Sequence, residues 1–177
     1  DGSLKYQPIY ISAPEYQVLD NVNHPDAMLG KAGNRQSASL YDMIPAVPQN
    51  QKPYGEWNKA RIMVYKGTVV HAQNDENVVE YHLWTPQWTD MLQASKFSAE
   101  KWPIGFELLN TCGGAERKGY IGVQDHGDDV LIAHALAHDF QLIFKRNLLI
   151  LKAGHQNSGQ ECNDDGYIVK THGNLHC

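Results

Sequence analysis

Short alternating segments separated by turn residues most constrain the fold of this chain. Apolar and polar positions alternate over runs of about four to eight residues, and Gly, Pro or Asn-Asp pairs stand between the runs. Alternate side chains of a strand point to opposite faces, so such runs are typical of half-buried strands. The pattern predicts a mostly β chain, folded as an antiparallel sandwich or barrel. The predicted strands are Glu15–Asp20, Lys59–Tyr65, Thr68–Gln73, Val78–His82, Tyr120–Gln124, Val130–Leu136, Phe140–Lys145, Leu148–Lys152 and Tyr167–Lys170.

One segment, residues 85–97, has the pattern of a helix instead. Thr85 can cap the helix, a proline occupies the first helical position, and Trp88, Leu92 and Ser95 recur on one face. We therefore expect one short helix, packed across an edge of the sandwich.

The length of 177 residues favours a single domain over residues 1–177, since domains usually hold about 100–200 residues. Residues Asn21–Gln51 contain turn chemistry such as His-Pro-Asp and Pro-Ala-Val-Pro, and predict a long loop with a short ordered stretch at Ser39–Ile44. Long ordered loops often carry function, so this loop is a candidate for part of a site.

Composition and missing motifs exclude several classes of protein. The net charge of −5 argues against nucleic acid, anionic membranes and polyanionic substrates as partners. No apolar stretch is long enough to span a membrane, and the first residues lack a signal-peptide pattern. The sequence contains no GxSxG elbow, phosphate loop or dinucleotide fingerprint, so no organic cofactor is expected. The cysteines have no zinc-ribbon spacing and allow at most one disulfide; they are Cys112, Cys162 and Cys177.

Two segments could form a polar floor for a ligand. On a strand, Gln124 and His126 share a face opposite Asp125, and Glu15 and Gln17 share a face in the first predicted strand. Side by side, these strands would offer amides for sugar hydroxyls and a titratable pair for proton transfer. The alternative is a polar strand end whose side chains only face solvent.

The long loop adds three candidates, His24, Asp26 and Arg35, which could reach over that floor. Arg35 could stabilise an anionic intermediate, although loop His and Asp residues are often only turn formers. His134 and His138 have a spacing that could bind a metal from a helix, but the segment is strand-like, and four residues along a strand separate the rings by about 13 Å.

An ordered series of motifs across residues 1–130 resembles the 3-keto-disaccharide hydrolase family, a bacterial domain formerly of unknown function. The series is Glu15-Tyr-Gln-Val-Leu-Asp-Asn, His24-Pro-Asp26, Gly33-Asn-Arg, Ser39-Leu-Tyr-Asp, Gly55-Glu-Trp-Asn-Lys-Ala-Arg-Ile, Val78-Val-Glu-Tyr and Gly119-Tyr-Ile-Gly-Val-Gln-Asp-His-Gly. The resemblance implies a jelly-roll sandwich like concanavalin A, with a concave face for a sugar. After residue 130 the family's elements stand in an unusual order, which a simple circular permutation does not restore.

The resemblance also implies an activity: cleavage of glycosides that carry a ketone at C3, by β-elimination across C1–C2 followed by addition of water. A C3 ketone acidifies the C2 proton, so the site needs a base, a group to stabilise the enolate and an acid for the leaving group. We expect Glu15 or His126 to act as base or to bind a divalent metal ion, and Arg35 to lie near the developing negative charge. The expected substrate-binding residues are Gln17, Gln124, His24, Asp26 and Tyr41.

Two other classes remain open on the sequence alone. A non-catalytic carbohydrate-binding module would share the fold and the aromatic content, which includes four Trp and nine Tyr. A conventional glycoside hydrolase would need two carboxylates facing the anomeric bond, and no pairing with Glu15 is obvious. Domains of the resembled family are usually exported, so we expect a periplasmic or extracellular location.

Overall fold

The computed structural model describes residues 13–117 and 119, and the backbone of five later strands at 121–124, 130–133, 139–145, 148–154 and 167–170. Within these residues the chain is mostly β, as predicted. None of the described helices is both long and apolar enough to cross a membrane.

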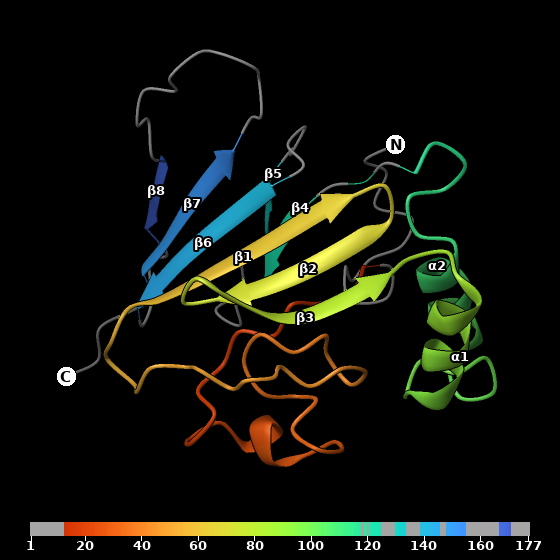
Figure 1. Ribbon diagram of the computed structural model, residues 1–177, viewed down its shortest axis with the longest axis horizontal. Helices are drawn as coiled ribbons and strands as arrows, with labels where there is room; N and C mark the ends of the chain where they lie inside the picture. Colours follow the sequence, from red (N-terminus) through yellow and green to blue (C-terminus); the bar gives the residue numbers. More distant parts are fainter. Residues whose placement is uncertain are drawn as a thin grey trace.

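The described strands form two antiparallel sheets. Six strands pair in the order β3-β2-β1-β6-β7-β8, and β4 pairs with β5 (Figure 1). Strands from early and late parts of the chain thus share one sheet, through the pairing of β1 with β6. The bounds are β1 Asn58–Tyr65, β2 Thr68–Gln73, β3 Glu76–His82, β4 Ile121–Gln124, β5 Val130–Ala133, β6 Asp139–Lys145, β7 Leu148–Gly154 and β8 Tyr167–Lys170.

Two tight hairpins connect β1, β2 and β3. The two-residue turns have positive φ at both positions: 48° and 87° at Lys66 and Gly67, and 50° and 69° at Asn74 and Asp75. Such turns match the right-handed twist of the paired strands. At Gly67 a Cβ atom would also come within 2.9 Å of the Trp84 ring, so glycine is required there for two reasons.

The prediction of a strand at Glu15–Asp20 is wrong. The segment forms one isolated bridge, between Tyr16 and Leu40, and exchanges a few backbone hydrogen bonds with residues 38–41. Its partner turns at Ala38 and Asp42, where φ is 66° and 61°, so the pairing cannot extend into a ladder.

The helix α1, Pro86–Ala94, forms as predicted. The Thr85 hydroxyl accepts a hydrogen bond from the Trp88 amide, and Trp88 and Leu92 are fully buried. The helix packs against β3, the strand at one edge of the larger sheet.

The prediction of a single helix is wrong, because a second helix, α2 (Pro103–Asn110), packs against α1. No side chain caps its first turn, and it contains Gly105, so local sequence favours it weakly. The Trp88 indole donates a hydrogen bond to the Leu109 carbonyl at 3.1 Å, which links the two helices.

The described core lies between the β2–β3 part of the sheet, the helices and the loops that precede β1. Figure 1 shows these loops as an irregular layer below β1–β3, with α1 and α2 beside β3. The buried apolar cluster draws on all three parts: Ala38, Leu40, Ala46, Val69, Val78, Val79, Tyr81, Trp88, Leu92, Phe97 and Leu109.

A buried polar network fixes the loop layer to the sheet. The side chain of Gln73, on β2, is fully buried. It accepts a hydrogen bond from the Ser37 hydroxyl at 2.6 Å and donates to side-chain oxygens of Gln49 and Asn50. Because unpaired buried amides are costly, these bonds select one position of the loop on the sheet.

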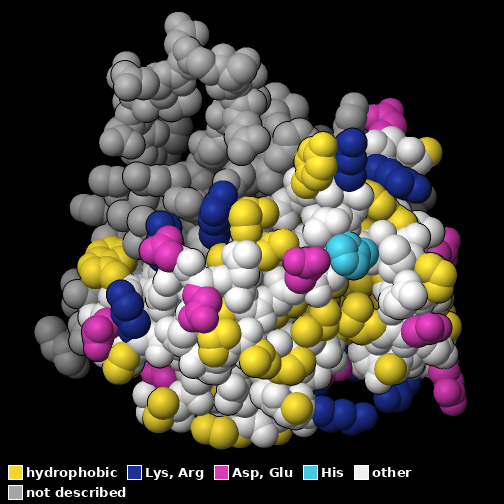
Figure 2. Space-filling model, viewed as in Figure 1, with side chains coloured by type: hydrophobic (Ala, Val, Ile, Leu, Met, Phe, Trp, Pro, Cys, Tyr) yellow, Lys and Arg dark blue, Asp and Glu magenta, His cyan; other side chains and the backbone are white. Residues whose placement is uncertain are grey.

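The described part of the face shown in Figure 2 is mixed in charge. On the face shown in Figure 2, acidic and basic side chains are interspersed and apolar side chains appear in small groups between them.

Candidate functional site

The loop Asn21–Gln51 is ordered by its own polar side chains. It contains a short 3-10 helix, Pro25–Met28, at whose start His24 Nδ1 accepts a hydrogen bond from the Asp26 amide at 3.2 Å. Just before it, Asp20 accepts hydrogen bonds from the backbone amides of Val22 and Asn23. The described geometry therefore gives His24 a capping role that fixes the position of Asp26.

Arg35 lies between two carboxylates. Its Nη1 donates to Asp26 at 2.9 Å and its Nε to Asp42 at 2.7 Å, and the three side chains are 11–23% exposed. These distances are those of charge-assisted hydrogen bonds. The planar fork of the guanidinium thus holds two parts of the loop at a fixed spacing.

Tyr41 and Lys96 complete the cluster. The Lys96 ammonium lies 4.1 Å from the centre of the Tyr41 ring, and the Arg35 guanidinium lies 5.2 Å from it. The backbone amide of Lys96 donates to the second oxygen of Asp42 at 3.0 Å. We call Asp26, Arg35, Tyr41, Asp42 and Lys96 the arginine cluster.

Mutual interactions set the protonation states of the arginine cluster. Partial burial would raise the pKa of Asp26, but hydrogen bonds from Arg35 and Tyr41 outweigh it and hold that pKa below its usual value. Burial and the Asp26 carboxylate raise the pKa of the Tyr41 hydroxyl. Burial lowers the pKa of Lys96, with Asp42 opposing the shift. At neutral pH the cluster therefore offers the Asp26 carboxylate, the Arg35 guanidinium and a protonated Tyr41 phenol at close range.

Glu15 and Gln17 border this cluster. The Glu15 carbonyl accepts a hydrogen bond from the Tyr41 amide at 3.0 Å, and the charge of Glu15 acts on both Tyr41 and Lys96. Gln17 pairs through its backbone with residues 38–39. Between them, Tyr16 turns toward the core, where its hydroxyl donates to the Ala72 carbonyl.

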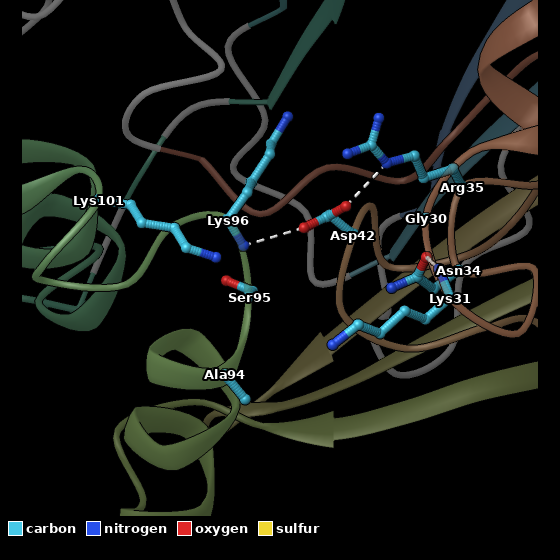
Figure 3. A pocket seen from close by; sticks show the side chains of 9 residues that line it. All are labelled: Gly30, Lys31, Asn34, Arg35, Asp42, Ala94, Ser95, Lys96 and Lys101. Atoms are coloured by element: carbon cyan, nitrogen blue, oxygen red, sulfur yellow. Dashed lines mark hydrogen bonds and ion pairs between the residues drawn. The ribbon is translucent and has the colours of Figure 1, made fainter.

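A cavity of about 260 Å³ opens beside the arginine cluster (Figure 3). One wall comes from the loop and the other from the end of α1 and the segment that follows it. The lining residues are Gly30, Lys31, Asn34, Arg35, Asp42, Ala94, Ser95, Lys96 and Lys101.

The structure thus brings together Glu15, Asp26, Arg35 and Tyr41 among the predicted site residues, with His24 supporting Asp26. His126 lies outside the described residues. Gln124 ends β4, where its backbone pairs with residue 130 and not with residues 15–20, and its side chain lies outside the description.

The described residues contain only one of the two predicted metal ligands, Glu15. Within residues 13–117, no group of three or more His, Cys, Asp or Glu side chains is arranged to hold a metal ion. The predicted metal pair with His126 therefore stays a prediction. Of the cysteines, Cys112 is a free, half-buried thiol, and the other two lie outside the description.

Sequence reasoning missed Asp42 and Lys96. Asp42 directly follows Tyr41 in the quoted Ser-Leu-Tyr-Asp motif, and its position seven residues after Arg35 was a usable signal. Lys96 had no local signal, because it meets Asp42 across 54 residues of sequence.

The chain is similar to known proteins over most of its length. A family model described as a 3-keto-alpha-glucoside-1,2-lyase-like domain matches residues 3–134, and the chain belongs to this family. The chain is 79% identical over 130 residues to a protein of Bacteroides thetaiotaomicron named 3-keto-disaccharide hydrolase. The match covers 73% of this chain but 45% of that relative, so the chain spans less than half of the relative's length.

Proposed function

We propose that the chain forms part of an enzyme that cleaves 3-keto-glycosides, and that it does so by elimination followed by hydration. A base removes the C2 proton, the C1–O bond breaks, and the aglycone leaves as an alcohol after protonation. Water then adds at C1 of the resulting enone, which gives the free 3-keto sugar. The net reaction is a hydrolysis, although its first step is that of a lyase.

The observation that carries this proposal is the arginine cluster, in which the motif segments 24–26, 33–35 and 39–42 meet Lys96. Membership of the family and the printed name of the relative supply the substrate class. An enolate formed beside a C3 ketone needs a cation within contact distance, and Arg35 and Lys96 are two cations beside one cavity.

The proposed roles follow from charge and position. Glu15, next to Tyr41, or His126 takes the C2 proton, and Arg35 stabilises the enolate oxygen. The carboxylate of Asp26, the phenol of Tyr41, the amides of Gln17 and Gln124 and the imidazole of His24 hold sugar hydroxyls. If Glu15 and His126 bind a divalent ion, that ion supplies Lewis-acid polarisation of substrate oxygens.

We further propose that the two sheets are parts of one jelly-roll sandwich over residues 1–177, with the sugar on its concave face. The pairing of β1 with β6 supports a shared sheet for early and late strands. We also propose a periplasmic or extracellular location, the usual one for domains of this family.

The test is incubation of the protein with a 3-keto-glucoside and with its unoxidised parent, with and without a chelator, while aglycone release is followed. We expect release from the ketone alone, because only the ketone acidifies the C2 proton. Release from the parent as well would point to a conventional glycoside hydrolase. Release from neither, combined with sugar binding, would point to a binding module.

The same experiment in deuterated water separates the mechanisms. Elimination and rehydration introduce deuterium at C2 of the released 3-keto sugar, whereas direct displacement at C1 leaves that hydrogen in place. Because a 3-keto sugar can exchange this hydrogen slowly by itself, free 3-keto-glucose without enzyme serves as the control.

A further inference from the structure

The cavity beside the arginine cluster is lined by an excess of positive charge. Four cationic side chains, Lys31, Arg35, Lys96 and Lys101, and one carboxylate, Asp42, line the cavity. The charges of Asp26 and Glu15 also act on Lys96, so the local excess is one positive charge. This excess is local, since the whole chain has a net charge of −5. The cavity is therefore a positive site in a negative protein.

Among the described residues, only one of the four cationic side chains that line the cavity forms an ion pair. Arg35 is paired with both Asp26 and Asp42, but within residues 13–117 no ion pair involves the ammonium groups of Lys31, Lys96 or Lys101. Lys96 packs over the rings of Tyr41 and Phe97 instead. The ammonium groups of Lys31 and Lys101 thus remain for a ligand.

The geometry suits a ligand that enters between two walls. Figure 3 shows Lys31 extending from the loop and Lys101 from the segment between α1 and α2, on opposite sides of the cavity. Asp42 ties these walls together, because it bonds Arg35 on one wall and the Lys96 amide on the other. The spacing of the two walls is therefore fixed before any ligand binds, and the exposed side chains of Lys31 and Lys101 extend from these walls.

The volume limits what the cavity can hold. Pockets that bury a whole drug-sized ligand usually enclose about 300–1,000 Å³. At about 260 Å³ this cavity suits one substituent of a larger molecule. Oxyanions are the groups that several Lys and Arg side chains bind best.

We propose that this cavity binds an oxyanion, a carboxylate or sulfate, carried by the glycoside substrate. The proposal rests on the proposed function for the identity of the substrate, and it adds anionic glycosides as the preferred class. The negative group would lie between Lys31 and Lys101, which extend toward one another across the cavity, beside the site proposed for the sugar.

The test compares anionic with neutral glycosides. A 3-keto-glucoside with a 4-carboxyphenyl aglycone and a phenyl 3-keto-glucuronide place the carboxylate on the aglycone and on the sugar, respectively. Each is compared with its neutral methyl ester. We expect kcat/KM to favour at least one acid over its ester by about tenfold at low salt, and the preference to shrink as ionic strength rises.

In the double variant Lys31→Gln, Lys101→Gln, the ratio of kcat/KM for the acid to kcat/KM for its ester should be close to one. The control variant Lys52→Gln, Lys66→Gln removes two exposed lysines outside the cavity and should keep the wild-type ratio. Equal kcat/KM for both acids and their esters in the wild type, or an acid preference that survives in the cavity variant, would overturn the proposal.

Binding of the unoxidised acids and esters, measured by calorimetry, separates this proposal from the proposed function. If the protein binds an acid more tightly than its ester through these lysines but cleaves no ketone, the anion site is supported and the proposed activity is contradicted. If it cleaves the ketones without preferring an acid, the proposed activity is supported and the anion site is contradicted. Inorganic sulfate that binds through Lys31 and Lys101, together with no preference among glycosides, would assign the cavity to a free ion and overturn the proposal.

Discussion

At the scale of single residues, Arg35 is the side chain on which the candidate site depends. Replacing it in the Arg35→Lys variant keeps the charge but removes the fork that reaches Asp26 and Asp42 together. If Arg35 stabilises the enolate, kcat/KM for a 3-keto-glucoside should fall about 100-fold. Two partly buried charge-assisted hydrogen bonds are also disturbed, so urea unfolding should show a loss of about 1–2 kcal/mol.

A matched control separates a local effect from a general effect of charge. The ion pair between Lys59 and Asp75 is exposed, and the Asp75→Asn variant should leave the unfolding free energy within about 0.5 kcal/mol and kcat/KM unchanged. If Arg35→Lys behaves like this control in both measurements, Arg35 has neither of the roles assigned to it.

Part of the site could be predicted residue by residue, and part could not. Asp26, Arg35 and Tyr41 could be found because each belongs to a motif with a local pattern, and the structure places them in contact. Lys96 could not, because its place beside Tyr41 depends on how α1 packs, which no local pattern reveals. The alternation that places Glu15 opposite Tyr16 belongs to a strand that does not form, although Tyr16 does turn toward the core and the charge of Glu15 acts on Tyr41 and Lys96.

At the scale of elements, prediction succeeded where local pattern and tertiary contacts agree. The β1–β2–β3 meander combines alternation with turn residues of positive φ, so both signals give the same strands. Residues Glu15–Asp20 have the alternating pattern of a strand, but no extended segment lies beside them to form a ladder. The helix α2 packs against α1, but no side chain caps its first turn. A strand needs a neighbour that the sequence of the strand itself does not specify.

The start of α1 offers a test of the capping argument. The Thr85 hydroxyl accepts from the Trp88 amide and donates to the His82 carbonyl, so it joins α1 to the end of β3. The Thr85→Ala variant should reduce the unfolding free energy by about 1 kcal/mol. The Thr85→Ser variant keeps the hydroxyl and should lie within a few tenths of a kcal/mol of the wild type. Equal losses in the two variants would show that the methyl group matters and the cap does not.

At the scale of the whole molecule, the loop layer and the sheet are joined by buried polar contacts as well as by the apolar core. His71, on β2, is 1% exposed and donates from Nδ1 to the Ala38 carbonyl of the loop layer at 2.9 Å. Its ring also contacts the rings of Tyr16 and Tyr81. The His71 imidazole thus connects the layer that carries the arginine cluster to β2 of the sheet.

This position makes the stability of the fold depend on pH. Burial lowers the pKa of His71 from 6.5 to about 4. Between these values the unfolded chain binds the proton and the folded chain does not, so the unfolding free energy falls as the pH falls from 6.5 toward 4. The expected contribution is a loss of about 2 kcal/mol by pH 5, whereas carboxylates with lowered pKa values, such as Asp26, act only at lower pH.

The His71→Gln variant tests this coupling. Its amide can still donate to the Ala38 carbonyl but does not titrate, so its unfolding free energy should depend less on pH than that of the wild type between pH 6.5 and 4.5. The slopes, and not the absolute stabilities, are compared, because the substitution can change packing at every pH. The difference should approach the about 1.4 kcal/mol per pH unit that one proton contributes. Parallel curves in this window would mean that folding does not lower the pKa of His71, and would contradict the proposed pH dependence.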